Sequence, residues 1–289
     1  MLSNRWVLAV AGTHGKTTTA SMLAWILEFA GRRPGFLIGG IAENFGISAR
    51  CGDSKLFVVE ADEYDTAFFD KRSKFIHYRP RTLLINNIEY DHADIFADIA
   101  AIRREFHHVV RIVPSHGRIV RHAQDAEIDR VLEQGCWTPL VTFSAKGGSW
   151  SVRPEHEDYS HFHVYFEGEY LAEVIWPLIG QHNAENALAA IACAEHVDVD
   201  PRLACQALSG FNSVKRRLQL LACVNDICVY DDFAHHPTAI AATLSALRAK
   251  VGTERRIIAV LEPRSNTMRM GIHNESLLNS LQLADKIFI

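Results

Sequence analysis

The chain has 289 residues, 48% of them hydrophobic and 22% charged, and its formal net charge at pH 7 is −4. This composition is typical of a globular protein, and the length allows two domains with separate cores. The charge gives no basic footprint for nucleic acid, and no apolar run approaches the roughly 20 residues of a membrane span. The six cysteines form no C-x-x-C pair, which predicts reduced thiols in a cytoplasmic protein.

Short apolar runs alternate with helical patterns along the first half of the chain. The runs are WVLAV (6–10), LFVV (56–59) and TLLI (82–85), and each is typical of a strand buried on both faces. Helical spacing of apolar residues follows the first run as far as Gly31 and returns around residues 99–110 and 127–133. Such alternation predicts a mostly parallel sheet flanked by helices.

The pattern changes between about residues 141 and 177. HFHVYFEGEYLAEVIW alternates between apolar and polar residues, which predicts a hairpin that turns at Glu167 and Gly168. An alanine-rich helix follows, and SGFNSVKRR has no periodicity, which predicts a linker. A second unit begins near Leu218 with a hairpin, a helix, the strand RIIAVL, another helix and the strand KIFI. Because nothing after KIFI would cover it, we expect the chain to be a fragment of a longer protein.

The segment GTHGKTT (12–18) follows the first predicted strand and opens the first helix. Gly12 and Gly15 let the backbone turn tightly against a phosphate, Lys16 supplies a cation, and the hydroxyl of Thr17 can ligate Mg²⁺. The standard loop G-x-x-x-x-G-K-[ST] has a further glycine upstream, which this chain lacks. The position at a strand–helix junction nevertheless favours nucleotide binding over a turn with a surface lysine.

Three further segments concentrate polar groups that can bind ligands or metals. FVVEADEYD carries acids from Glu60 onward at a strand end, where a carboxylate can hold Mg²⁺ opposite the loop, although most charge runs are only solvated. NNIEYDHADIF contains His92, which alone would more often be a structural histidine. YDDFAHHPTAI combines two acids with His235 and His236, so a zinc site is conceivable there.

The spelling G-T-x-G-K-T-T resembles the Mur ligase superfamily, the ATP-dependent enzymes that build the peptide stem of peptidoglycan. N-I-E-x-D-H-x-D, G-x-H-N-x-x-N and VKRR are also similar to that family, so the resemblance covers nearly the whole chain. It implies an α/β fold with a P-loop-type, mostly parallel sheet that is flanked by helices and extended by a small antiparallel hairpin region. An incomplete Rossmann-like α/β domain would follow this sheet. The implied domains are a central ATP-binding domain at 1–216 and a truncated C-terminal domain at 217–289, with the N-terminal UDP-binding domain absent.

The resemblance also implies which residues bind ATP and Mg²⁺. Thr17 and Glu60 would ligate magnesium, and His92 would reach a second metal ion, with Asn87 as a weaker candidate there. Several family members complete that site with a carbamylated lysine, but ADIAAIRREFHHVV contains no lysine. The residues expected to bind nucleotide are Gly12, Thr13, His14, Gly15, Lys16, Thr17, Thr18, Asn87, His182, Asn183, Asn186, Arg217 and Asp232.

The resemblance implies catalytic roles for three residues: Lys16, His92 and Arg217. Arg217 would contact the terminal phosphate, Asp232 the ribose, and GQHNAEN the adenine. A purely structural alternative exists for Asn183, which would serve as an ordinary N-cap of the alanine-rich helix. His235 and His236 are expected to line the cleft.

LEPRSNTMRMG is similar to the branch of the superfamily that joins L-Ala-γ-D-Glu-meso-diaminopimelate to UDP-N-acetylmuramate in peptidoglycan recycling. The implied reaction passes through an acyl phosphate, which the tripeptide amine displaces, and Arg264, Ser265 and Asn266 are candidate peptide contacts. Three alternatives remain: a UDP-N-acetylmuramate–L-alanine ligase, a P-loop nucleotide hydrolase, and a fragment that only binds nucleotide. We expect little or no ligation by these residues alone.

Overall fold

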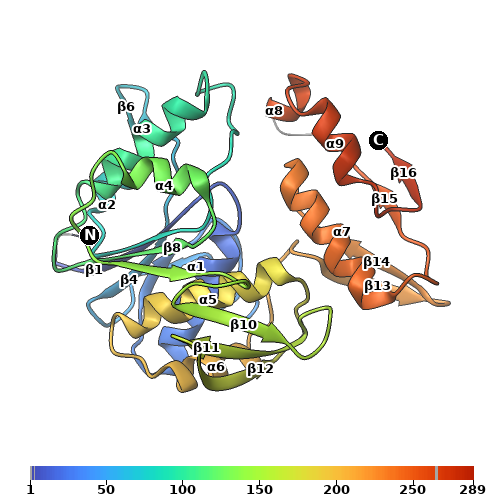
Figure 1. Cartoon of the computed structure of the whole chain (residues 1–289), viewed down its shortest axis with the longest axis horizontal. Helices are drawn as coiled ribbons and strands as arrows, with labels where there is room; N and C mark the ends of the chain where they lie inside the picture. Colours follow the sequence, from blue (N-terminus) through green and yellow to red (C-terminus); the bar gives the residue numbers. More distant parts are fainter. Residues whose placement is uncertain (1, 3, 264–265) are drawn as a thin grey trace.

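The centre of the computed structural model, which describes residues 2, 4–263 and 266–289, is a ten-stranded sheet (Figure 1). Its strands, in spatial order, are β12 (Glu169–Ile175), β11 (His161–Phe166), β10 (Trp150–Pro154), β9 (Leu140–Phe143), β8 (Arg118–His122), β7 (Thr82–Ile85), β1 (Trp6–Ala11), β4 (Leu56–Glu60), β2 (Gly35–Leu37) and β3 (Ala49–Arg50). Neighbours from β10 to β2 are parallel, whereas β10–β11, β11–β12 and β2–β3 are antiparallel. The predicted mostly parallel sheet with an added hairpin region is confirmed.

Two helical layers cover this sheet because its central strands are apolar on both faces. On β1, Leu8 and Val10 join one buried cluster and Val7 and Ala9 join the other, as the alternation of side chains along a strand requires. The first layer consists of α1 (Lys16–Phe29), α5 (Gln181–Glu195) and α6 (Pro201–Ser209), and the second of α2 (Phe75–Tyr78), α3 (Ile99–Val110) and α4 (Ala126–Leu132). Figure 1 shows the two layers on opposite sides of the strands.

The last 70 or so residues form a second unit beside the large sheet (orange to red in Figure 1). Its elements are β13 (Gln219–Val224), β14 (Ile227–Asp231), α7 (Pro237–Val251), β15 (Ile258–Val260), α8 (Asn266–Arg269), α9 (Asn274–Ser280) and β16 (Lys286–Phe288). β13 and β14 are antiparallel, and β15 and β16 are parallel. Ile240, Leu244, Ile257 and Leu281 belong to its own buried cluster. The remaining hairpin, β5 (Asp65–Ala67) with β6 (Asp70–Ser73), follows the acidic run in the first unit.

One local expectation and one structural alternative are wrong. Cys223 and Cys228 form a disulfide, because the register of β13 and β14 places them directly opposite each other with their Cα atoms 4.1 Å apart. The prediction of reduced thiols therefore fails for this pair, which a spacing rule based on C-x-x-C does not detect. Asn183 is not the N-cap of α5, since the helix begins at Gln181 and its N-cap is Gly180. Among the described residues, no helix is long and apolar enough to cross a membrane.

Candidate active site

The loop between β1 and α1 has a backbone shape that depends on its glycines. Gly12 has φ 134° and Gly15, the N-cap of α1, has φ 79°, both in the region that side chains other than glycine rarely adopt. A Cβ atom on Gly15 would lie 2.6 Å from Asn186 Oδ1 and 2.6 Å from Asn86 Nδ2. No side chain caps α1, so the N–H groups of its first turn remain available to an anion.

Two neighbouring asparagines after β7 hold this loop in place. The Oδ1 atom of Asn87 accepts a hydrogen bond from the backbone N–H of His14 at 2.8 Å, and Asn87 O accepts from Thr13 N at 3.0 Å. The Nδ2 atom of Asn86 donates to Asn186 Oδ1 at 2.9 Å. Asn87, the weaker candidate for the second metal site, therefore supports the phosphate loop. The hydrogen bond from Asn86 connects α5 to the same region.

Lys16 is buried at the start of α1 among oxygen atoms. Its ammonium donates to Gly12 O at 2.7 Å and to Glu63 Oε2 at 3.2 Å, and it lies 3.4 Å from Asp62 Oδ1. Burial opposes the charge of Lys16, but the carboxylates of Glu63, Asp62 and Glu60 outweigh it and raise the pKa of the amine. Lys16 is therefore a permanent cation beneath the loop.

Glu60 faces the loop from the end of β4, as its register with Val10 on β1 requires. Its Oε1 atom accepts a hydrogen bond from the Thr17 hydroxyl at 2.8 Å, and its Oε2 atom accepts from Gly39 N at 2.6 Å. Arg217, in the segment between the two units, donates from Nη2 to the same Thr17 oxygen at 3.4 Å. The structure thus brings Thr17, Glu60 and Arg217 together at one end of the loop.

His92 lies next to a different acid, Glu63. The two side chains approach to 3.3 Å between His92 Nε2 and Glu63 Oε1, and His92 Nδ1 is 2.6 Å from the Tyr64 hydroxyl. Glu63 is only 1% exposed, and although burial disfavours its charge, Lys16 and the hydrogen bond with His92 lower its pKa to about 2. His92 has a positive φ of 55°, and Asp91 Oδ1 accepts from its backbone N–H at 2.7 Å.

A pocket of about 680 Å³ lies beside the loop, and both units line it. Its size is that of a small-molecule site. Among the expected nucleotide contacts, the pocket is lined by His14, Gly15, Thr18, Asn87, His182, Asn183, Asn186, Arg217 and Asp232, but not by Gly12, Thr13, Lys16 or Thr17. His235 and His236 are not lining residues either.

Local hydrogen bonds fix several pocket side chains. Asn183 Nδ2 donates to Ile179 O at 2.7 Å, and the carboxylate of Asp232 accepts from the backbone N–H groups of Leu218 and Ala234, each at 2.7 Å. Burial lowers the pKa of His182, so its imidazole is neutral at pH 7. Carboxylates of Glu185 and Asp232 act on the same imidazole.

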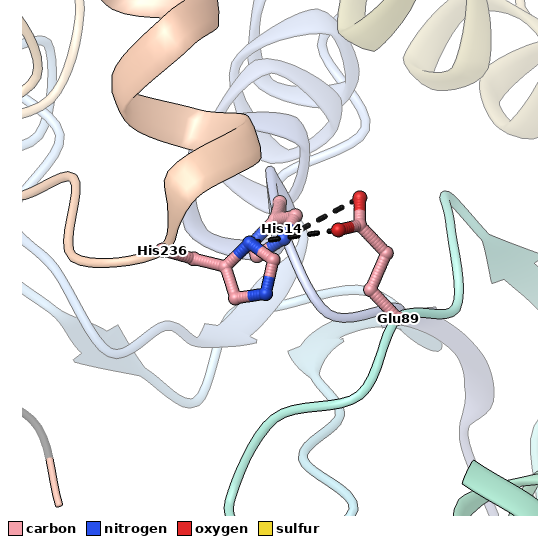
Figure 2. Close-up of side chains that lie close together, drawn as sticks. All are labelled: His14, Glu89 and His236. Carbon is pink, nitrogen blue, oxygen red and sulfur yellow. Dashed lines mark ion pairs between the residues drawn. The ribbon is translucent and has the colours of Figure 1, made fainter. Parts of the chain in front are cut away.

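Glu89 connects the phosphate loop to the second unit. Figure 2 shows its carboxylate facing the imidazoles of His14 and His236, at 3.7 Å and 3.5 Å respectively. The hydroxyl of Thr238, in the first turn of α7, donates to Glu89 Oε2 at 2.6 Å. Among the described residues, the cluster of potential metal ligands that contains His236 also contains His14 and Glu89. It contains no other residue of YDDFAHHPTAI.

A second contact between the units involves LEPRSNTMRMG, the segment that is similar to the tripeptide ligases. The hydroxyl of Thr267 donates to Asp91 Oδ1 at 2.8 Å, and Asn266 Nδ2 donates to Asp94 Oδ2 at 2.9 Å. Asp91 also accepts from His92, so α8 contacts the loop that positions His92. Arg264 and Ser265, the other candidate peptide contacts, lie outside the described residues.

Three residues central to this geometry were given no role by the sequence. Glu63 lies in the acidic run FVVEADEYD, but nothing in the spacing distinguishes a buried carboxylate from an exposed one. Glu89 lies in NNIEYDHADIF and Thr267 in LEPRSNTMRMG. The only available signal was their position within a motif, because their partners come from distant segments.

Comparison with known proteins gives two adjacent family matches. Residues 10–194 match the Mur ligase middle domain, and residues 216–289 match the Mur ligase, glutamate ligase domain. The chain is 57% identical over all 289 residues to the UDP-N-acetylmuramate–L-alanyl-γ-D-glutamyl-meso-2,6-diaminoheptandioate ligase of Haemophilus influenzae, and covers 64% of that protein.

Two further proteins are similar along most of the chain. A crystal structure of the murein peptide ligase of Psychrobacter arcticus superposes with a TM-score of 0.76 and 46% identity, over 99% of this chain and 63% of that one. The UDP-N-acetylmuramate–L-alanine ligase of Caldanaerobacter subterraneus is 33% identical, over 100% of this chain and 61% of its own length. The chain thus spans slightly less than two thirds of the length of these relatives.

Proposed function

This chain belongs to the Mur ligase family, and we propose that it carries the ATP-binding part of a ligase that joins L-Ala-γ-D-Glu-meso-diaminopimelate to UDP-N-acetylmuramate. On this proposal, residues 1–216 are the central ATP-binding domain and residues 217–289 the N-terminal part of the C-terminal domain. The support for this substrate pair is the 57% identity to a relative named for it, compared with 33% to an L-alanine ligase.

ATP and Mg²⁺ are the cofactors that fit the donor groups. Thr17 Oγ1 and Glu60 Oε1 are 2.8 Å apart at the end of the loop, and hydroxyl and carboxylate oxygens are ligands that Mg²⁺ prefers. On this proposal, His92 and the neighbouring Glu63 would hold a second ion. Bound Mg²⁺ would neutralise phosphate charge.

The chain's own groups bind and orient the reactants. Lys16 and the N–H groups at the start of α1 would hold the phosphates, and Arg217 would contact the terminal phosphate. As the lactyl carboxylate attacks the γ-phosphorus, ADP leaves and an acyl phosphate forms. The tripeptide amine then displaces phosphate and forms the amide bond. Positioning and positive charge carry this chemistry, so it needs no covalent side chain.

The observation that carries the proposal is the buried Lys16 ammonium beneath a glycine loop whose far end meets Glu60. Replacing Lys16 by alanine is expected to weaken binding of a non-hydrolysable ATP analogue with Mg²⁺ by about tenfold to a hundredfold, because a charged hydrogen bond is worth about 1.5–3 kcal/mol. Lys146→Ala, on an exposed residue, is the matched control. Equal affinity of both variants in calorimetry would contradict the proposal.

Substrate choice is tested with a protein of the relatives' full length that contains these residues. It is supplied with UDP-N-acetylmuramate, ATP and Mg²⁺, together with either the tripeptide or L-alanine. Faster coupling of the tripeptide is expected, whereas faster coupling of L-alanine would establish the alternative that the 33% identical relative favours. ATP turnover that is independent of UDP-N-acetylmuramate would instead indicate a nucleotide hydrolase.

A further inference from the structure

A second group of potential metal ligands lies on the outer face of the β11–β12 hairpin. On β11, Phe162 and Val164 are fully buried in the core, so the residues that alternate with them, His161 and His163, point to the opposite face. His163 is paired directly with Glu173 on β12. The strand pattern and the register therefore gather two imidazoles and one carboxylate at one place.

The three side chains converge on a single point. Glu173 Oε2 lies 2.8 Å from His161 Nε2 and 3.8 Å from His163 Nε2, and one donor atom from each residue lies within 4.8 Å of the others. In a tetrahedral zinc site, metal–ligand bonds of about 2.0–2.1 Å place ligand atoms about 3.3 Å apart. Small side-chain adjustments therefore suffice to bring all three donors to bonding distance.

The three side chains are accessible from solvent and lie beside aromatic rings. The exposed fractions of the side chains are 19% for His161, 31% for His163 and 51% for Glu173, so water can reach the remaining coordination position. The ring of Tyr170 contacts His163 with centroids 5.6 Å apart. The nearby cation, Arg153 on β10, stacks on Tyr165 at 4.6 Å from the ring centroid.

We propose that His161, His163 and Glu173 bind a divalent transition-metal ion of the zinc class and thereby connect β11 to the edge strand β12. Two histidines and one glutamate with an open position are a known zinc donor set, whereas Mg²⁺ prefers oxygen ligands throughout. None of the three residues lines the nucleotide pocket. The site is therefore independent of the proposed ligase chemistry.

The test is a calorimetric titration of the 289-residue chain with Zn²⁺ in the presence of excess Mg²⁺, which occupies oxygen-rich sites. The wild type is expected to bind one more equivalent of Zn²⁺ than the double variant His161→Asn/His163→Asn. Glu173→Gln is expected to weaken this binding by at least about tenfold, since losing even an outer partner of a metal ligand costs 10–100-fold. The control His116→Asn changes an exposed histidine outside the group and should bind as the wild type does.

Thermal unfolding gives an independent readout. Because the ion binds the folded hairpin, Zn²⁺ should raise the melting temperature of the wild type and of His116→Asn by more than that of the double variant, which keeps the group of His14, Glu89 and His236. Equal stoichiometry and affinity in the wild type and the double variant would overturn the proposal. If the double variant does not fold, Glu173→Gln decides alone, and unchanged zinc affinity in it would be equally fatal. ATP-analogue binding should be the same in all of these proteins, which separates this result from the proposed function.

Discussion

The replacement Glu63→Gln tests the charge network beneath the phosphate loop. Glu63 is buried, and its carboxylate is the acid nearest to the Lys16 ammonium, at 3.2 Å. Glutamine keeps the shape of the side chain but removes the charge. Lys16 would then remain buried with Asp62 as its nearest carboxylate, at 3.4 Å.

The size of the effect follows from the pKa of Glu63. Its decrease from 4.5 to about 2 corresponds to ~3 kcal/mol in favour of the charged form in the folded protein, at about 1.36 kcal/mol per pKa unit. Removing one partner of a buried ion pair costs about 3–5 kcal/mol in other proteins, which agrees with this value. We therefore expect Glu63→Gln to lower the free energy of unfolding at pH 7 by ~3 kcal/mol.

Urea denaturation of the chain without nucleotide, in the presence of a chelator, measures this quantity. The matched control is Glu133→Gln at the exposed end of α4, which should change the free energy of unfolding by no more than about 0.5 kcal/mol. A similar small change for Glu63→Gln would refute the conclusion that the pair with Lys16 stabilises the fold.

Three further predictions concern the loop and its contacts with the second unit. Gly15→Ala should abolish ATP-analogue binding because its Cβ would collide with two asparagine side chains, whereas Gly31→Ala, with a similar positive φ but open space, should bind normally in the same calorimetric assay. Burial lowers the pKa of His236 to about 4, so its neutral form stabilises the fold above pH 6.5, and this stability is lost as the pH falls towards 4. The free energy of unfolding in urea should therefore vary less with pH over that range for His236→Gln than for the wild type. Thr267→Val removes the hydroxyl that donates to Asp91 and should lower the free energy of unfolding by about 1 kcal/mol, and a value near zero in urea denaturation would show that this contact does not stabilise the protein.

Much of the architecture could be read from local patterns. Apolar runs such as WVLAV predicted β1, and helical spacing predicted α1, because a strand or helix buries its own apolar face wherever it packs. The alternation in HFHVYFEGEYLAEVIW predicted the β11–β12 hairpin with its turn at Glu167 and Gly168. The glycine loop was equally local, since the strand, the turn and the helix that form it are adjacent in the chain.

The partners of the functional side chains came only from the tertiary structure. The sequence placed Glu60, His92 and Arg217 in separate motifs, and the sheet register together with the segment before β13 determined that Arg217 meets Thr17 while His92 meets Glu63. The disulfide between Cys223 and Cys228 likewise depends on which residues face each other across a hairpin.

By itself, then, the sequence determined the elements, the phosphate loop and the family resemblance, because these depend on residues close together in the chain. The tertiary structure decided that Glu63 is the buried counter-charge of Lys16 and that Glu89 links the loop to α7. It also decided that two histidines and a glutamate meet on the outer face of β11 and β12. Burial and distance between remote residues govern charge, hydrogen bonding and metal affinity, and they exist only once the chain has folded.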